Sequence, residues 1–137
     1  MPCLFQAKAM PTDKDTSSTV ADLKADIRQF VQERDWEQFH NPKDLAIGLS
    51  IEAAELLEHF RFRSDSEVAA RLQDAGFRQK ISHELADVLY FVLILCDYLE
   101  LDATTILAEK MAISASRYPV HRVKGRNLKY TEYDAEE

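Results

Sequence analysis

The stretch from Phe77 to about Leu99 restricts the fold of this chain more than any other feature of its sequence. Its apolar residues recur every three or four positions, which is the period of one face of an α-helix. Two more apolar residues widen this stripe, so we expect a core helix that is buried on nearly all sides. The stripe consists of Ile81, Leu85, Val88, Leu89, Val92, Leu95 and Leu99, with Phe91 and Ile94 beside it.

The most apolar run of this helix, Val88 to Cys96, lies between Asp87 and Asp97. It is far shorter than the roughly 20 residues that a membrane-spanning helix needs. The sequence therefore predicts no contact with a membrane. Cys3 and Cys96 are the two cysteines, and their different surroundings make a disulfide an unattractive interpretation. A reducing cytoplasm is the expected compartment.

Helices are also expected in the rest of the chain. With 3 Gly and 4 Pro and no short runs of alternating polarity, a sheet with its turns is poorly supported. Capping residues and proline predict the helix ends. A first helix is expected from Ser18 or Thr19 to about Trp36, and a second begins with Asn41 as its cap and Pro42 at its first helical position. A short helix is expected between Arg61 and Gly76, and a last one from Asp102 to a point before Pro119.

Length and pattern together predict an all-α chain that forms a four-helix bundle. We expect one catalytic domain over residues 19–133. A flexible leader at residues 1–18 should precede it, and an acidic tail at residues 134–137 should follow it. The net charge of -7 argues against long nucleic acid as a partner, because a phosphate backbone requires a basic surface. A single nucleotide bridged by a metal ion is compatible with this charge.

Two pairs of carboxylates carry the clearest chemical signal. Glu52 and Glu55 are three residues apart, as are Glu84 and Asp87, so each pair projects from one face of its helix. If the two helices pack antiparallel, the four acids converge in the interior, where like charges repel one another. A bound cation relieves this repulsion, and oxygen ligands suit Mg²⁺. One acid should act as general base, and we prefer Glu55 over Glu52.

Three alternatives compete with this interpretation. Lys or Arg could neutralise the acids in buried ion pairs, which predicts no dependence on metal. A di-iron carboxylate bundle needs E-x-x-H on each of two helices, and the chain offers only Glu37 with His40. A non-catalytic helical oligomer or regulatory module would explain the wide apolar faces but would leave the acids without a purpose.

The order E-x-x-E and then E-x-x-D resembles the MazG-like all-α nucleoside triphosphate pyrophosphatases. Four segments resemble their compact branch, which includes the dCTP pyrophosphatases and the integron-associated MazG-like proteins: RDWEQFHNPKDLAIGLSIEAAELLEHF, ELADVLYFV, KMAISASRYPV and GRNLKYTEY. The resemblance covers about residues 20–133. It implies a homotetramer in which the four acids bind Mg²⁺. The reaction that it implies is the cleavage of a (deoxy)nucleoside triphosphate to the monophosphate and pyrophosphate, and the implied role is house-cleaning of the nucleotide pool.

The same resemblance implies that Lys110 and Arg117 bind oxygens of the triphosphate. Ser114 lies between them, where relatives often carry asparagine, as a candidate contact to phosphate or sugar. It also implies that the region of Trp36, Phe39 and His40 helps to line the base pocket, where the rings could stack on the base and the histidine could donate a hydrogen bond.

Two further residues complete the set of candidates. Phe62 matches a position where close relatives can have tryptophan in the base pocket. Because a smaller ring can change which base is preferred, the resemblance does not assign the substrate, for example dCTP or dATP. Glu58 extends the carboxylate face of its helix by one more turn. It is a secondary candidate that could hydrogen-bond the ligand shell of the metal or orient water.

Overall fold

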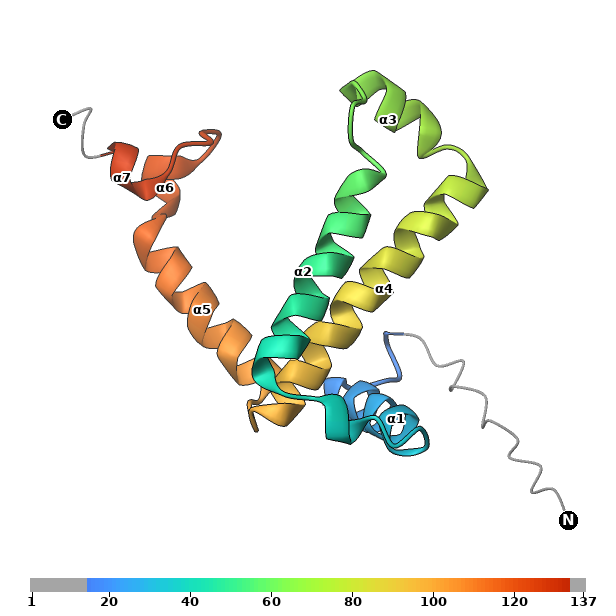
Figure 1. Cartoon of the computed structure of the whole chain (residues 1–137). Helices are drawn as coiled ribbons and strands as arrows, with labels where there is room; N and C mark the ends of the chain where they lie inside the picture. Colours follow the sequence, from blue (N-terminus) through green and yellow to red (C-terminus); the bar gives the residue numbers. More distant parts are fainter. Residues whose placement is uncertain (1–14, 134–137) are drawn as a thin grey trace, which may run out of the picture. The chain divides into compact units, whose positions relative to one another are not determined.

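The computed structural model describes residues 15–133, and helices make up all the regular structure of this part of the chain (Figure 1). The all-helical class is therefore confirmed. The elements are α1 (Val20–Gln32), the 3₁₀ turn η1 (Glu37–Phe39), α2 (Pro42–Glu58), α3 (Asp65–Arg71), α4 (Ala75–Tyr98), α5 (Ala103–Arg117), α6 (Val120–Val123) and α7 (Tyr130–Tyr133).

Most helix starts follow from local capping chemistry. Thr19 caps α1 in a capping box with Asp22, and Asn41 caps α2 with Pro42 at the first helical position. The side chain of Asp102 accepts a hydrogen bond from the backbone N–H of Thr105 at the start of α5. The start of α4 is two residues earlier than predicted, because Asp74 accepts from the backbone N–H of Phe77 and so caps the helix.

The predicted end of the first helix near Trp36 is wrong. Helix α1 ends at Gln32, and Asp35 has a backbone φ of 53° in the left-handed region, which cannot continue a right-handed helix. The chain then enters η1, so Trp36 and His40 lie on a tight turn between α1 and α2. This turn places both side chains near the middle of α4, as described below.

The chain divides into two compact units, residues 1–100 and residues 101–137, which we describe separately. In the first unit α2 packs along α4, and α1 packs against α4 as well (Figure 1). Val31, Leu45 and Ile94, one from each of these helices, form the buried core. The predicted single domain over residues 19–133 spans both units and stays a prediction.

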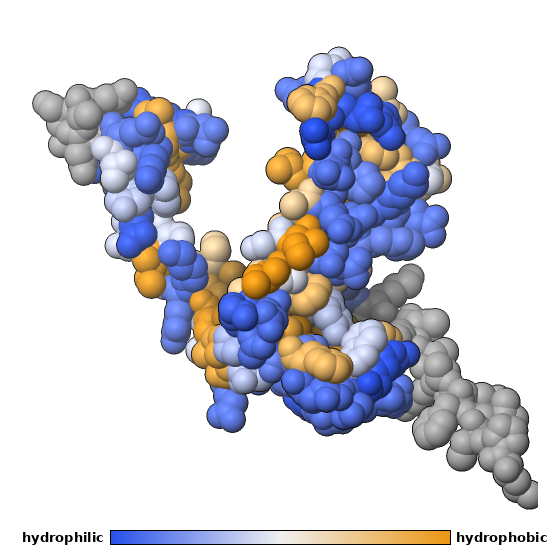
Figure 2. Space-filling model, in the orientation of Figure 1, coloured by the Kyte–Doolittle hydropathy of each residue, from blue (hydrophilic) through white to orange (hydrophobic). Residues whose placement is uncertain are grey.

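The expectation that α4 is buried on nearly all sides is wrong. Leu85, Leu89 and Val92 are 51, 49 and 38% exposed, and on α2 Ile47 and Ile51 are 50 and 51% exposed. The reason is geometric: among the described residues α1 and α2 pack extensively along α4, and two helices cannot enclose a third. Figure 2 shows apolar side chains reaching the surface along α2.

The second unit contains α5 and two short helices. Helices α6 and α7 form in its segment after Pro119, where we predicted no further helix. The rings of Tyr118 and Tyr130 meet edge to face with centroids 6.0 Å apart. The predicted leader lies largely outside the described residues, and the acidic tail lies wholly outside them. Among the described residues, every helix is too short or too polar to cross a membrane.

Candidate metal centre

Helices α2 and α4 bring three of the four predicted metal ligands together. Glu52 and Glu55 lie on α2 and Glu84 lies on α4, and one carboxylate oxygen of each lies within 4.8 Å of the others. The E-x-x-E spacing therefore works as predicted, since it places both α2 acids on the side that faces α4.

Asp87, the fourth predicted ligand, is exposed and lies one turn along α4 from Glu84. It falls outside the tight group of three but is close enough for its charge to act on Glu52. The pKa of Glu52 is raised, first because neighbouring atoms shield its carboxylate from water and then because Glu55, Asp87 and Glu84 repel its charge. All four acids thus share one electrostatic site.

The site is open, and the expectation that the acids converge in the interior is wrong. Glu52 and Glu84 are half-buried, whereas Glu55 and Asp87 are exposed. The reason is that the acids line one edge of the α2–α4 contact, while the core of this unit lies nearer α1. Openness leaves room for water and for a large anionic substrate beside the carboxylates.

Two of the alternatives drawn from the sequence, buried ion pairs and a di-iron site, find no support among residues 15–100. Across residues 15–100, the ion pairs of Lys and Arg are made with acids other than these four. The candidate ligand group found among the described residues contains only glutamates, without the histidines that a di-iron site requires.

One histidine does contact the cluster from outside. His59, at the C-terminal end of α2, has its Nε2 atom 3.3 Å from Oε1 of Glu84. Its ring meets the buried ring of Phe77 edge to face, with centroids 5.8 Å apart. We did not predict this residue, and the sequence offered only its position four residues after Glu55 as a signal.

The donor set fits a hard divalent cation. It contains only carboxylate oxygens, which are the ligands of Mg²⁺ and Ca²⁺, and it lacks the sulfur and imidazole ligands that select softer metals. Burial first, and then the charges of Glu55, Asp87 and Glu84, raise the pKa of Glu52, and a bound cation would favour its charged form.

An aromatic pocket of about 330 Å³ lies beside the acids. It contains two of the predicted base-binding residues, Trp36 and His40, together with the predicted ligand Asp87. The rings of Phe30 and Trp36 meet edge to face at 5.8 Å. The full lining is Phe30, Trp36, His40, Asp87, Tyr90 and Phe91.

Sequence reasoning missed three members of this pocket. Phe30 comes from α1, whereas Tyr90 and Phe91 follow Asp87 by three and four positions on α4. That spacing places them on the same face as Asp87, so the available signal was helical periodicity applied from the metal ligand outward.

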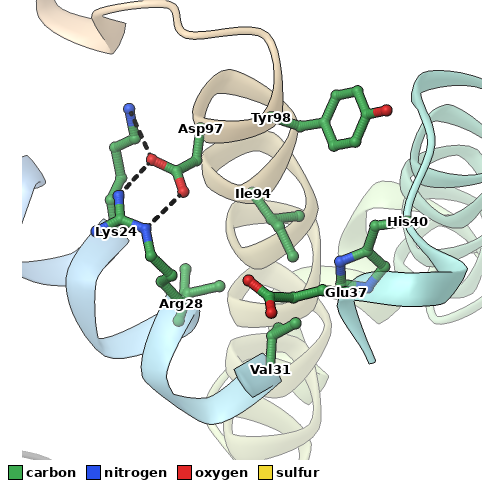
Figure 3. A pocket seen from close by; sticks show the side chains of 9 residues that line it. Lys24, Arg28, Val31, Glu37, His40, Ile94, Asp97 and Tyr98 are labelled. Atoms are coloured by element: carbon green, nitrogen blue, oxygen red, sulfur yellow. Dashed lines mark hydrogen bonds and ion pairs between the residues drawn. The ribbon is translucent and has the colours of Figure 1, made fainter. Parts of the chain in front are cut away.

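A second pocket, of about 260 Å³, lies between α1, η1 and the end of α4 (Figure 3). Arg28 donates two hydrogen bonds to Asp97, and Lys24 lies 3.6 Å from the same carboxylate. The hydrogen bonds from Arg28 hold the pKa of Asp97 below its usual value. His40 lines both pockets, so it separates this pocket from the aromatic one.

Three predicted residues of the first unit lie apart from these features. Phe39 is 64% exposed and Phe62 is 91% exposed, and neither lines the aromatic pocket. Phe62 has a backbone φ of 57°, and the guanidinium of Arg61 lies over its ring at 4.5 Å. Glu58 is exposed and lies 3.7 Å from Arg61.

The predicted phosphate-binding residues belong to the second unit. Lys110 is exposed on α5, Ser114 is half-buried there, and Arg117 ends the helix with its guanidinium 5.1 Å from the centre of the Tyr130 ring. Lys110 and Arg117 are seven residues apart, which places them on one face of α5.

Comparisons with known proteins agree on one family. The model of the MazG-like family matches residues 47–133. dCTP pyrophosphatase 1 of Rattus norvegicus is 35% identical over 126 residues, which cover 92% of this chain and 74% of the relative. dCTP pyrophosphatase 1 of Homo sapiens is 35% identical over 114 residues, covering 83% and 67%.

The fold has a relative of known structure, a pyrophosphatase from Archaeoglobus fulgidus DSM 4304. The two chains share 37% identity with a TM-score of 0.67 over 72% of this chain and 91% of the other. The matched part of the sequence includes both carboxylate pairs, so the resemblance noted in the sequence is confirmed. This chain belongs to the MazG-like family.

Proposed function

We propose that the protein hydrolyses (deoxy)nucleoside triphosphates to the monophosphate and pyrophosphate, with Mg²⁺ held by Glu52, Glu55, Glu84 and Asp87. The observation that carries the proposal is the meeting of Glu52, Glu55 and Glu84 within 4.8 Å in a chain whose relatives are pyrophosphatases. The negative charges of these three carboxylates repel one another, and a cation held among them would relieve that repulsion.

A bound Mg²⁺ would neutralise charge on the triphosphate and on the departing pyrophosphate. Around it, Glu52 and Glu84 are half-buried and suited to hold the cation. Glu55 is exposed and can accept a proton from the water that attacks the α-phosphorus. The raised pKa of Glu52 favours the role of ligand, since its charged form needs a nearby cation.

The rest of the substrate has candidate partners. Trp36, His40 and the rings around them offer a stacking surface for the base next to Asp87. Lys110 and Arg117 supply cations for phosphate oxygens, and Ser114 on the same helix supplies a hydroxyl. The relatives act on dCTP according to their names, and dCTP and dATP are the first substrates to test.

A homo-oligomer, as the family resemblance implies, would give the exposed apolar side chains of α2 and α4 a partner. Leu85 and Leu89 of α4 and Ile47 and Ile51 of α2 are about half exposed in the single chain. Light scattering after size-exclusion chromatography should give the mass of a tetramer. A monomer at micromolar concentration would contradict this part of the proposal.

The activity is tested with purified protein and each deoxynucleoside and ribonucleoside triphosphate, with Mg²⁺ or with a chelator. Ion-exchange chromatography separates the products. Monophosphate that appears without diphosphate, and only with Mg²⁺, is the expected result. Diphosphate as the first product, or no turnover of any triphosphate by the folded protein, would contradict it.

A further inference from the structure

We propose that His59 is a positioning residue that orients Glu84 for metal binding, an inference that rests on the function proposed above. The two residues come from different helices, His59 from the end of α2 and Glu84 from α4. Their side chains meet with Nε2 and Oε1 3.3 Å apart, and both are partly shielded from water, at 22 and 20% exposed.

The contact has a defined direction. An ionised carboxylate only accepts hydrogen bonds. We therefore assign the hydrogen atom of the contact to Nε2 of His59, which donates a hydrogen bond to Oε1 of Glu84. The second oxygen of Glu84 stays available for a cation shared with Glu52 and Glu55. Hydrogen bonds of this kind fix the rotamer of a metal ligand, and their loss typically weakens metal binding about 10- to 100-fold.

The histidine is itself held in place. Its ring packs edge to face on Phe77, which is 4% exposed, and the guanidinium of Arg71 lies 4.3 Å from the centre of the Phe77 ring. Phe77 in the first turn of α4 therefore packs against the imidazole, and Arg71 of α3 packs in turn against Phe77. A ring that is packed in this way loses little further freedom when it holds Glu84.

The test compares Mn²⁺ binding, measured by electron paramagnetic resonance without nucleotide, in variants of two neighbouring histidines. His59→Leu removes the donor, and His59→Gln keeps an N–H at nearly the same reach. His83→Leu is the matched control, because His83 precedes Glu84 on α4 but is exposed. His59→Met, which is more flexible, replaces the leucine variant if that variant melts at a lower temperature.

The expected result is a Kd for Mn²⁺ about tenfold higher in His59→Leu or His59→Met, and within about threefold of wild type in His59→Gln and His83→Leu. In turnover, the Mg²⁺ concentration for half-maximal activity should rise by the same factor while kcat at saturating Mg²⁺ stays within about twofold. A purely structural role would not be rescued by glutamine in this way.

Two results would overturn the inference while leaving the metal centre intact. One is unchanged Mn²⁺ binding in His59→Leu while Glu84→Gln loses it. The other is equal loss in His59→Gln and His59→Leu, which would mean that the imidazole acts through its packing or as a direct ligand and not as a hydrogen-bond donor to Glu84. Unchanged Mn²⁺ binding in Glu84→Gln itself would instead overturn the proposed metal centre.

Discussion

Arg28 of α1 donates two hydrogen bonds, of 3.0 and 2.6 Å, to the carboxylate of Asp97 near the end of α4. This bidentate contact ties the N-terminal helix to the helix that carries Glu84 and Asp87. Arg28 and Asp97 also line the second pocket, which His40 lines as well (Figure 3). The position of α1, and with it that of Trp36, therefore depends on a polar contact as well as on the small core.

The Arg28–Asp97 contact predicts a specific dependence of stability on pH. The folded-state pKa of Asp97 is lowered, so its contribution is present above its unfolded pKa of about 3.9 and is lost as pH falls further. Asp97→Asn should lower the melting temperature at pH 7 by a few degrees and by less at pH 3, where the carboxyl group of the unfolded chain is largely protonated. Thermal melts by circular dichroism measure both values, and an equal deficit at the two pH values would contradict the assignment.

For Glu52 in the metal-free protein we expect the opposite dependence of stability on pH. Its folded-state pKa is raised, so its contribution to stability is present at low pH and is lost as pH rises through the raised pKa. Glu52→Gln should therefore melt higher than wild type at pH 7 with chelator, and the difference should vanish near pH 4. Adding Mg²⁺ at pH 7 should stabilise wild type and not the variant. A variant that melts lower than wild type under chelator would refute this prediction.

Replacement of Gly48 by alanine should lower the stability of the fold, although the position is in a helix. A Cβ at this position would collide with the ring of Phe91, which lines the aromatic pocket. Gly48→Ala should destabilise the fold by about 1–3 kcal/mol, although alanine is the better helix former. Gly76→Ala is the matched control, because its Cβ would meet only Asp74 at 3.4 Å. Urea unfolding should show no loss for this control, and equal effects at the two glycines would be inconsistent with a close α2–α4 contact at Phe91.

The aromatic pocket predicts which ring contributes to nucleotide binding. Trp36→Ala should raise KM about tenfold or more, since stacking of a base on an aromatic ring contributes about 1–3 kcal/mol. Phe39→Ala is the comparison, because Phe39 is the last residue of η1 but lies outside the pocket lining. Steady-state kinetics with the best substrate separate the two. A larger effect at Phe39 would place the base elsewhere.

Features set by neighbouring residues were predictable from the sequence. Asn41 with Pro42 and Asp102 set helix starts through contacts within four residues, and the i, i+3 spacing of Glu52 and Glu55 follows from helical geometry. The meeting of these acids with Glu84 needed only one assumption beyond these, the antiparallel packing of two helices.

Features set by distant contacts were not predictable. The left-handed conformation of Asp35 moves Trp36 off α1 and into the turn beside α4. The exposure of Leu85 and Leu89 depends on how many helices surround α4, which periodicity alone cannot count. The contact of His59 with Glu84 joins residues 25 positions apart, and no local pattern encodes it.

The most direct test of the account is the rate of pyrophosphate release by Glu84→Gln, compared with wild type, at saturating Mg²⁺ and the best nucleoside triphosphate. Glu84 is the acid of α4 that lies within 4.8 Å of both α2 acids, and glutamine keeps its size while removing its charge. The account predicts a loss of at least about 100-fold, because metal-based charge stabilisation contributes several kcal/mol, with an unchanged circular dichroism spectrum. Activity close to that of wild type in the folded variant would contradict the claim that these acids form the metal centre of the reaction.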